Sequence, residues 1–252
     1  MTLLQSLPQP AIFAHRGASA YAPENTLAAF ELAVRQGADA IELDAKLSAD
    51  GRVIVIHDQT VDRTTGVSGS VQNLTLAQLR ELDAGSFFAP EFRGEKIPTL
   101  EEVFESFAKR ALINVELSNH YTPRDNLVEE VCKTIKRFNI QDQILFSSFH
   151  PTSLAKAQAL LPDIPRGLLA NTDFRAAIVR SFVFNFGNYQ ALHPHLKTAS
   201  PQQVRRVHRI RRRVHVYTVN EERHLRKLFH WGVDGVFTDD PPLAVRVRGE
   251  KG

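Results

Sequence analysis

Two acidic residues, Glu42 and Asp44, stand two positions apart in the apolar stretch AIELDAKLSADGRVIVIHD, residues 40–58. Side chains at positions i and i+2 of a strand point to the same face of a sheet. Two carboxylates on one face of a strand are costly unless they lie exposed at the strand end or share a cation. The spacing therefore makes Glu42 and Asp44 candidate metal ligands.

A turn follows these acids and reverses the chain. Asp50-Gly51 lies between two apolar, β-branched runs, which is a strong hairpin signal. The hairpin folds residues 53–57 back beside residues 43–47. It therefore brings His57 close to the two acids, so that two carboxylates and an imidazole meet at one place.

Further polar residues fall at the ends of predicted strands. His15 and Arg16 end the first strand, and Glu116 lies on the third. In a parallel barrel all of these strand ends face one mouth. Glu42, Asp44 and Glu116 then form an anionic cluster of oxygen donors, which suits Mg²⁺ or Ca²⁺ rather than zinc.

The basic residues in this set have two interpretations each. Arg16 offers a planar fork for a phosphate oxygen, and its alternative is a structural ion pair with a neighbouring acid such as Glu24. An isolated histidine is commonly a hydrogen-bonded structural residue. Imidazoles titrate near neutrality, however, so one of His15 and His57 could take a proton while the other gives one. A cation, an arginine and two histidines around one cleft indicate phosphoryl transfer from an uncharged nucleophile.

These side chains are carried by strands that alternate with amphipathic helices along almost the whole chain. Eight such units in 252 residues are typical of a (β/α)8 barrel, and a doubly wound open sheet is the competing architecture. Strands are expected at residues 11–15, 40–44, 111–117, 143–149, 166–170, 189–193, 214–219 and 234–238. Helices are expected at residues 24–36, 99–109, 126–138, 151–161, 173–183, 200–211, 221–231 and 241–247.

One segment, residues 45–98, interrupts the alternation. It holds the hairpin strand, two turn-rich stretches and a short helix near residues 75–82. Loops that follow barrel strands lie at the face where active sites are built. We therefore expect a single α/β domain over residues 1–252, a (β/α)8 TIM barrel with a small inserted subdomain between the second strand and its helix.

Composition limits the functional classes. Hydrophobic residues make up 43% and charged residues 23% of the chain, as in an ordinary soluble enzyme. A formal charge of +3 is compatible with an anionic substrate and does not require nucleic acid or a membrane. The single cysteine, Cys132, excludes an intramolecular disulfide and a cysteine-rich zinc site. No signal peptide or integral membrane segment is recognisable, so a cytoplasmic location is expected.

An arginine-rich stretch, RRVHRIRRRVH at residues 205–215, needs a separate interpretation. It could form a nucleic-acid patch. Val204, Val207 and Ile210 have the spacing of a core-facing helix stripe, however. The stretch is therefore interpreted as the solvated face of a helix, and no nucleic-acid partner is expected.

Together these motifs resemble the glycerophosphodiester phosphodiesterase family across nearly the whole chain. The family's opening signature is matched by AHRGASAYAPENTLAAFELAVRQGAD, and its second signature by IELDAKLSADGRVIVIHDQTVDRTTG. Its insertion is matched by LRELDAGSFF and GEKIPTLEEVF, and its closing portion by VYTVNEE and WGVDGVFTDDP. A single HRG or ELD is weak evidence, whereas the ordered set is highly specific.

The resemblance implies a barrel with an inserted subdomain, a divalent cation, and hydrolysis of small-molecule glycerophosphodiesters to glycerol 3-phosphate and an alcohol, as in glycerol and lipid metabolism. In the implied reaction the glycerol 2-hydroxyl is the internal nucleophile, and water opens the resulting cyclic phosphate. Each step needs one base and one acid. Position by position, the resemblance assigns metal binding to Glu42, Asp44 and Glu116, acid/base catalysis to His15 and His57, and phosphate contact to Arg16.

The chain departs from the family pattern at two candidate substrate-pocket residues. Family members usually carry a lysine two residues after the third acid, where this chain has Ser118. Glu116 and Ser118 share a strand face, so the change removes a positive charge from the expected pocket. Tyr217 stands where the family commonly has tryptophan, which makes the apolar wall smaller.

Two alternative functions remain open. The first is the same chemistry on lysophospholipids, a lysophospholipase D-like activity, with Phe87, Phe88 and Phe92 of the insertion lining an acyl-chain groove. The interpretation favoured here is that these phenylalanines form the insertion's own small core. The second is a non-catalytic module that binds phosphate esters, which the intact His15 and His57 argue against.

Overall fold

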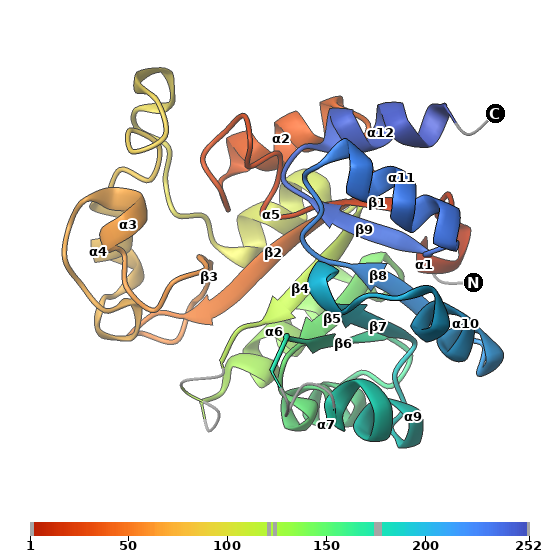
Figure 1. Ribbon diagram of the computed structural model, residues 1–252. Helices are drawn as coiled ribbons and strands as arrows, with labels where there is room; N and C mark the ends of the chain where they lie inside the picture. The colour runs from red at the N-terminus through yellow and green to blue at the C-terminus, as the bar shows by residue number, and fades with distance from the viewer. Residues whose placement is uncertain (1–2, 120–121, 123–124, 174–177, 251–252) are drawn as a thin grey trace.

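A closed barrel of parallel strands forms the centre of the molecule in the computed structural model, which describes residues 3–119, 122, 125–173 and 178–250 (Figure 1). β1 pairs with both β2 and β9, which closes the ladder, and the other barrel strands follow one another in sequence order. The predicted (β/α)8 barrel is therefore confirmed. Its strands are β1 (Ala11–Ala14), β2 (Ala40–Leu47), β4 (Leu112–Leu117), β5 (Ile144–Ser148), β6 (Arg166–Ala170), β7 (Ala191–Pro194), β8 (Arg213–Val216) and β9 (Gly235–Thr238).

Helices surround the barrel and bury one apolar face each against the outer side of the strands (Figure 1). They are α2 (Leu27–Arg35), α5 (Leu100–Phe107), α6 (Leu127–Phe138), α7 (Pro151–Leu160), α9 (Phe184–Phe186), α10 (Pro201–Arg209), α11 (Glu222–Trp231) and α12 (Pro241–Gly249), and α1 (Leu3–Ser6) precedes the barrel. Short 3₁₀ turns are η3 (Gln141–Gln143) and η5 (Leu196–Thr198), and a π-helical turn is η4 (Val179–Val183). None of the described helices has the length and apolarity that crossing a bilayer requires.

The helical predictions hold with two exceptions. The helix expected at residues 173–183 lies partly outside the described residues, and its described part continues through η4 and α9 to Phe186. Val204 and Val207 of α10 are buried as predicted, but Ile210 is 43% exposed. The prediction that Ile210 faces the core is wrong because α10 ends at Arg209, so Ile210 is the C-cap residue and does not continue the buried stripe of the helix.

Alternate residues along each strand point to opposite sides of the barrel wall and belong to two different apolar clusters. Outward residues such as Ile12 and Ile41 pack under the helices in the main core. Inward residues fill the base of the barrel, and above them the inward positions become polar toward the carboxyl ends of the strands. The inner cluster consists of Leu4, Ala11, Phe13, Ala40, Leu112, Leu145 and Phe237.

The segment between β2 and α5 stands beside the barrel mouth and carries α3 and α4 (Figure 1). It contains β3 (Val53–Val55), α3 (Asp62–Thr65), η1 (Val71–Asn73), α4 (Leu76–Glu81) and η2 (Pro90–Phe92). β3 runs antiparallel to β2 with Ala45 opposite Val55, which is the predicted hairpin. β2 continues to Leu47, so the first residues of the expected insertion lengthen the strand.

This segment has an apolar cluster of its own, made of Ile54, Ile56, Val61, Val71, Leu79, Ala84 and Ile97. The phenylalanines expected to form that core do not belong to it. Phe87 is 40% and Phe88 37% exposed, and their rings meet edge to face at 6.4 Å. The expectation was wrong because aliphatic residues from β3, η1 and α4 already fill the interior of the segment.

Candidate functional site

A tight turn after β1 directs His15 and Arg16 toward β2. Arg16 has φ 57° and Gly17 has φ 85°, both in the left-handed region. A Cβ on residue 17 would lie 2.6 Å from the Cβ of Ala29, so α2 approaches too closely for any side chain there. The turn lets the Arg16 N–H donate to Glu42 Oε2 at 2.9 Å, which ties the end of β1 to the acids of β2.

Three carboxylates meet inside the barrel mouth. The register of β2 and β4 sets Asp44 opposite Glu116 and Glu42 opposite Asn114. One oxygen from each of Glu42, Asp44 and Glu116 lies within 4.8 Å of the others. The structure thus brings together the three acids that the sequence singled out.

The positive charge near this cluster is too small to compensate three buried carboxylates, and the pKa values of two of them are raised. Burial, then Asp44 and Glu116, raise the pKa of Glu42 well above its ordinary value. Burial and the charge of Asp44 raise the pKa of Glu116 to about 8. Burial also opposes ionisation of Asp44 and is the largest single effect. Arg16, whose Nε lies 3.4 Å away, outweighs it together with His57, the hydrogen bond from Asn25 and His15, so the pKa of Asp44 falls. At neutral pH the cluster therefore retains protons that a bound cation would displace.

Neutral oxygens complete a donor set that fits a hard divalent cation. Asn114 Oδ1 is buried and has no hydrogen-bond partner within the described part of the chain, and Asn114 lines the same cavity as Glu42 and Glu116. Asn25 fixes Asp44 by donating from Nδ2 to Oδ2 at 3.0 Å. Carboxylate and amide oxygens are the ligands that Mg²⁺ and Ca²⁺ prefer, so the residues present fit such an ion.

Both candidate histidines use the same ring nitrogen in a contact with a carboxylate. His15 Nδ1 lies 2.7 Å from Asp239 Oδ1, and His57 Nδ1 lies 2.8 Å from Asp58 Oδ1. Both histidines line one cavity. Because Nδ1 is engaged in each ring, Nε2 is the atom left for proton exchange with a bound molecule.

Asp239 was not among the residues predicted from sequence. Ser19 Oγ donates to Asp239 Oδ1 at 3.0 Å, and the backbone N–H of Asp239 donates to Asn220 Oδ1 at 2.9 Å. Burial opposes its ionisation, but the contact with His15 lowers the pKa of Asp239. The strand period contained a signal: residues 235 and 237 of β9 point into the barrel, so residue 239 has the inward parity.

A chain of ion pairs links the two sides of the mouth. Arg16 Nη1 donates to Glu24 Oε1 at 3.0 Å, as in the structural alternative for this arginine. Arg63 donates to both Glu24 oxygens at 2.7 Å and through Nε to Asp58 Oδ2 at 2.6 Å. Sequence reasoning did not single out Arg63 or Asp58. Arg63 comes from the segment beside the barrel and so holds the partner of His57 in place.

The cavity between these groups has a volume of about 280 Å³. Its polar side holds the two histidines, Arg16, Glu42 and Glu116, and its apolar side holds Phe149, Leu169, Tyr217 and Phe237. Tyr217 meets Phe149 edge to face at 6.1 Å. A chamber with a charged side and an apolar side suits a small polyol phosphate rather than a polymer.

Ser118 does not line this cavity. Its Oγ lies 3.0 Å from Glu116 Oε1 and 3.2 Å from Asp44 Oδ1. Its carbonyl oxygen accepts a 2.9 Å hydrogen bond from the Lys46 amine, which was not predicted from sequence. Lys46 is buried on the same face of β2 as the acids, so a positive charge is present close to the position where the family pattern has lysine.

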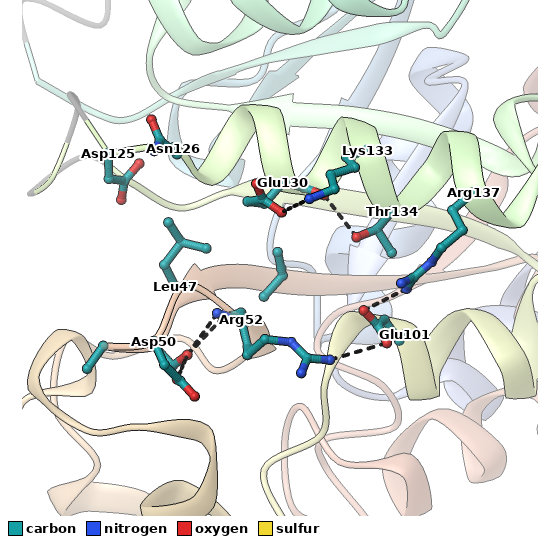
Figure 2. A pocket seen from close by; sticks show the side chains of 14 residues that line it. Leu47, Asp50, Arg52, Glu101, Asp125, Asn126, Glu130, Lys133, Thr134 and Arg137 are labelled. Carbon is teal, nitrogen blue, oxygen red and sulfur yellow. Dashed lines mark hydrogen bonds and ion pairs between the residues drawn. The ribbon is translucent and has the colours of Figure 1, made fainter.

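A larger surface groove, of about 790 Å³, lies between the β2–β3 hairpin, α5 and α6 (Figure 2). Its charged side chains pair with one another: Arg52 and Arg137 both reach Glu101, at 3.4 and 2.6 Å (Figure 2). Among the described residues that line it there is no histidine and no cluster of carboxylates with unmet charge. The smaller cavity in the barrel mouth is therefore the candidate active site.

Comparisons with known proteins identify the family of this chain. A protein-family model described as the glycerophosphoryl diester phosphodiesterase family matches residues 15–243. The glycerophosphodiester phosphodiesterase of Caldanaerobacter subterraneus subsp. tengcongensis is 37% identical over 94% of this chain and 96% of its own. That of Bacillus altitudinis is 39% identical over 95% of this chain and 98% of its own.

Solved structures agree with these relatives. A phosphodiesterase from Oleispira antarctica, in complex with the product sn-glycerol-3-phosphate, has a TM-score of 0.91 and 34% identity, covering 99% of this chain and 100% of its own. A glycerophosphodiester phosphodiesterase from Agrobacterium tumefaciens has a TM-score of 0.81 and 29% identity, covering 94% of this chain and 99% of its own.

Proposed function

This chain belongs to the glycerophosphoryl diester phosphodiesterase family and is a phosphodiesterase of glycerophosphodiesters, and we propose that it acts through His15, His57 and a divalent cation. One observation carries the proposal. Both histidines, each with Nδ1 on a carboxylate, line the cavity that also holds Arg16 and two of the clustered acids. The products are glycerol 3-phosphate and an alcohol.

In this proposal Glu42, Asp44 and Glu116 hold the cation, Mg²⁺ or Ca²⁺, and Asn114 Oδ1 is a further oxygen donor. When bound, the cation supplies positive charge that stabilises charge developing on the phosphate oxygens. Arg16 contacts the phosphodiester with its guanidinium group. Its position in the wall of the cavity supports this role. The apolar side of the cavity receives the carbon chain of glycerol.

The two histidines divide the proton transfers between them. One histidine takes the proton of the glycerol 2-hydroxyl as that oxygen attacks phosphorus, and the other gives a proton to the departing alcohol oxygen. In the second step the roles reverse. Water attacks the cyclic phosphate and gives its proton to the histidine that protonated the alcohol and is now neutral. The other histidine, now charged, protonates the ester oxygen that leaves. Asp239 and Asp58 keep each ring in one orientation throughout.

The segment 45–98 is, in this proposal, an inserted subdomain of one barrel domain over residues 1–252. Its own apolar cluster supports separate packing, and the Arg63–Glu24 pair supports a fixed position beside the mouth. A second substrate class follows from its surface. Phe87 and Phe88 are exposed and continue edge to face with the half-buried Phe92. This series could receive an acyl chain, so lysophospholipids are the second candidate substrates.

A hydrolysis panel tests the proposal. Glycerophosphocholine, glycerophosphoethanolamine, lysophosphatidylcholine and a nucleotide diester are each incubated with and without chelator, and glycerol 3-phosphate or the lysophosphatidic product is quantified. Chelator-sensitive release of glycerol 3-phosphate from the first two supports the proposal. Absence of turnover on every diester, together with tight binding of a phosphate ester, would favour the non-catalytic binding module.

A further inference from the structure

An apolar stripe runs along the helical segment between β6 and β7, on the outer wall of the barrel. Ile178, Phe182 and Phe186 lie four residues apart and are 47%, 64% and 79% exposed. The rings of Phe182 and Phe186 lie 4.7 Å apart. Phe184, on the other side of the segment, is fully buried, so exposure of the stripe is not a consequence of a poorly packed segment.

The charge of the chain is segregated into the same sector. Residues 174–220 hold nine of the 31 lysines and arginines and none of the 28 aspartates and glutamates. The remainder of the chain holds 22 basic residues against 28 acidic ones. A net charge of +3 therefore conceals one strongly basic sector on an otherwise acidic protein.

Helix α10 displays much of this charge. Val204 and Val207 face the barrel, and Arg205 and Arg209, one turn apart, are exposed on the opposite side. Arg211, just beyond the helix, is exposed as well. Within the described residues no ion pair joins Arg205, Arg209 or Arg211 to an acid, unlike the arginines of α11 and α12.

The apolar stripe and the basic helix are neighbours, and the side chain of Arg212, just after the helix, contacts the segment that carries the stripe. Arg212 donates to the carbonyl oxygens of Phe184 and Gly187, the latter at 2.8 Å, and its guanidinium stacks 5.0 Å from the Phe184 ring. α9 and α10 lie on the side of the barrel away from α3 and α4 (Figure 1). We call Ile178, Phe182, Phe186, Arg205, Arg209 and Arg211 the basic aromatic face.

We propose that the basic aromatic face docks on the surface of an anionic phospholipid bilayer. Exposed phenylalanines enter the boundary between headgroups and acyl chains, while arginines beside them attract lipid phosphates. A second copy of the chain fits less well, because a two-fold contact would set the arginines of one face against those of the other. Nucleic acid would use the arginines but would leave the apolar stripe without a partner.

The fold gives this docking a definite orientation. Barrel helices run antiparallel to the strands, so a bilayer against α9 and α10 lies alongside the barrel wall. The mouth then opens beside the membrane surface and not into it. Glycerophosphodiesters are deacylated phospholipids, so docking would hold the enzyme where its substrates are released. The inference rests on surface chemistry and stands apart from the catalytic proposal.

Vesicle flotation with the full chain tests the inference. Vesicles of phosphatidylcholine alone are compared with vesicles containing about a third phosphatidylglycerol, at low and high salt. We expect binding to the anionic vesicles only, weakened by salt. The double variants Arg205→Gln/Arg209→Gln and Phe182→Ser/Phe186→Ser should each lower the partition coefficient by about 10-fold or more.

Matched controls separate the face from general effects. Arg93→Gln/Lys109→Gln removes the same charge elsewhere, and Val67→Ser removes an exposed apolar side chain elsewhere, so both should bind like the wild type. Turnover of soluble glycerophosphocholine checks that each variant is folded. Equal loss in face and control variants would overturn the proposal, as would absence of vesicle binding by the wild type. Tighter binding to a duplex oligonucleotide, or a dimer that Phe186→Ser dissociates, would also overturn it.

Discussion

The side chain of Asp239 contacts His15 across the barrel mouth, with 2.7 Å between Oδ1 and Nδ1, although the two residues are 224 positions apart. His57 has the same arrangement with its neighbour Asp58. A carboxylate on Nδ1 fixes the tautomer that leaves Nε2 available and stabilises the charged ring when Nε2 takes a proton. Each histidine thus has the support that a general acid or base needs.

Removing the charge of Asp239 should slow the reaction without unfolding the protein. Asp239→Asn preserves the shape of the side chain but no longer stabilises the imidazolium of His15. We expect kcat to fall by about 10²-fold or more, with a much smaller change in KM. Steady-state kinetics between pH 5.5 and 8.5 measure both effects.

The adjacent residue provides the control. Asp240 caps α12 by accepting from the Leu243 N–H at 3.0 Å, a role that asparagine retains. Asp240→Asn should therefore keep wild-type kinetics. Equal losses in the two variants would mean that Asp239 acts through the structure of the loop and not through His15.

Replacement of the histidines distinguishes an enzyme from a binding module. A general acid or base typically contributes about 10²–10⁴-fold, so His15→Ala and His57→Ala should each lower turnover by that order while substrate binding changes far less. Because groups that act as a pair are strongly non-additive, the double variant should be little worse than the poorer single variant. Release of glycerol 3-phosphate at saturating metal measures all three. Wild-type turnover in either single variant would remove that residue from the mechanism.

Strand positions and the hairpin were predictable because their causes are local. Alternating apolar residues mark β2, and Asp50-Gly51 supplies a residue with φ 74° at the turn before β3. Once β2 and β4 are parallel neighbours, the parity of Asp44 and Glu116 determines that they meet. The acid cluster therefore followed from the period of two along each strand together with the expected parallel barrel.

The partners of the histidines could not be predicted in the same way. Asp239 reaches His15 only because the barrel closes β1 onto β9, which is a property of the whole sheet. Arg63 reaches Glu24 because the inserted segment packs against the turn after β1. Ion pairs between loops depend on how those loops settle in space, and no local pattern in the sequence encodes that arrangement.

Metal affinity should depend on pH through the acid cluster. In the metal-free protein Glu116, with its pKa raised to about 8, holds a proton at neutral pH, and a cation must displace it. Affinity for Mg²⁺ or Ca²⁺ should therefore rise as pH increases from 6.5 toward 8, by up to about 10-fold per unit for one displaced proton. Calorimetric titration at several pH values measures this.

Variants of the acids extend this test. Glu42→Gln, Asp44→Asn and Glu116→Gln should each weaken metal binding, and Glu116→Gln should also flatten the pH dependence. Loss of one acid relieves repulsion, so the melting temperature of the metal-free protein should hold or rise for Glu42→Gln and Glu116→Gln. Glu130→Gln on the surface of α6 is the control. Unchanged affinity in Glu42→Gln and Glu116→Gln would remove the metal assignment.

Variants of the insertion should separate substrate range from stability. Phe88 is 37% exposed whereas Leu79 is fully buried in the insertion's own cluster. Phe88→Ser should change the free energy of unfolding by less than about 1 kcal/mol and raise KM for lysophosphatidylcholine more than for glycerophosphocholine. Leu79→Ala should cost about 2–5 kcal/mol. Urea unfolding and kinetics measure these effects. Loss of the cooperative transition in Phe88→Ser would show that the aromatic loop belongs to the main core.

Two histidines lie beneath the candidate active site, inside the barrel. His215 Nδ1 and His193 Nε2 are 3.2 Å apart, both side chains are fully buried, and Phe13 and Phe237 pack around them. Burial lowers the pKa of His193 to about 3, and burial together with His193 lowers the pKa of His215 well below its ordinary value. Both rings are therefore neutral in the folded protein.

This pair should make the protein sensitive to acid. The unfolded chain binds protons on these histidines below about pH 6.5, while the folded chain does not until far lower pH, so each ring removes about 1.4 kcal/mol of stability per pH unit as pH falls below that value. His215→Phe keeps an aromatic ring without the titrating group. As pH falls from 6 to 4, the free energy of unfolding of His215→Phe minus that of the wild type should therefore increase by about 1.4 kcal/mol per pH unit. Urea unfolding at each pH gives the difference, and the exposed His230→Gln should show no such trend. A difference between His215→Phe and wild type that stays constant with pH would mean that the buried ring takes up a proton as readily as in the unfolded chain.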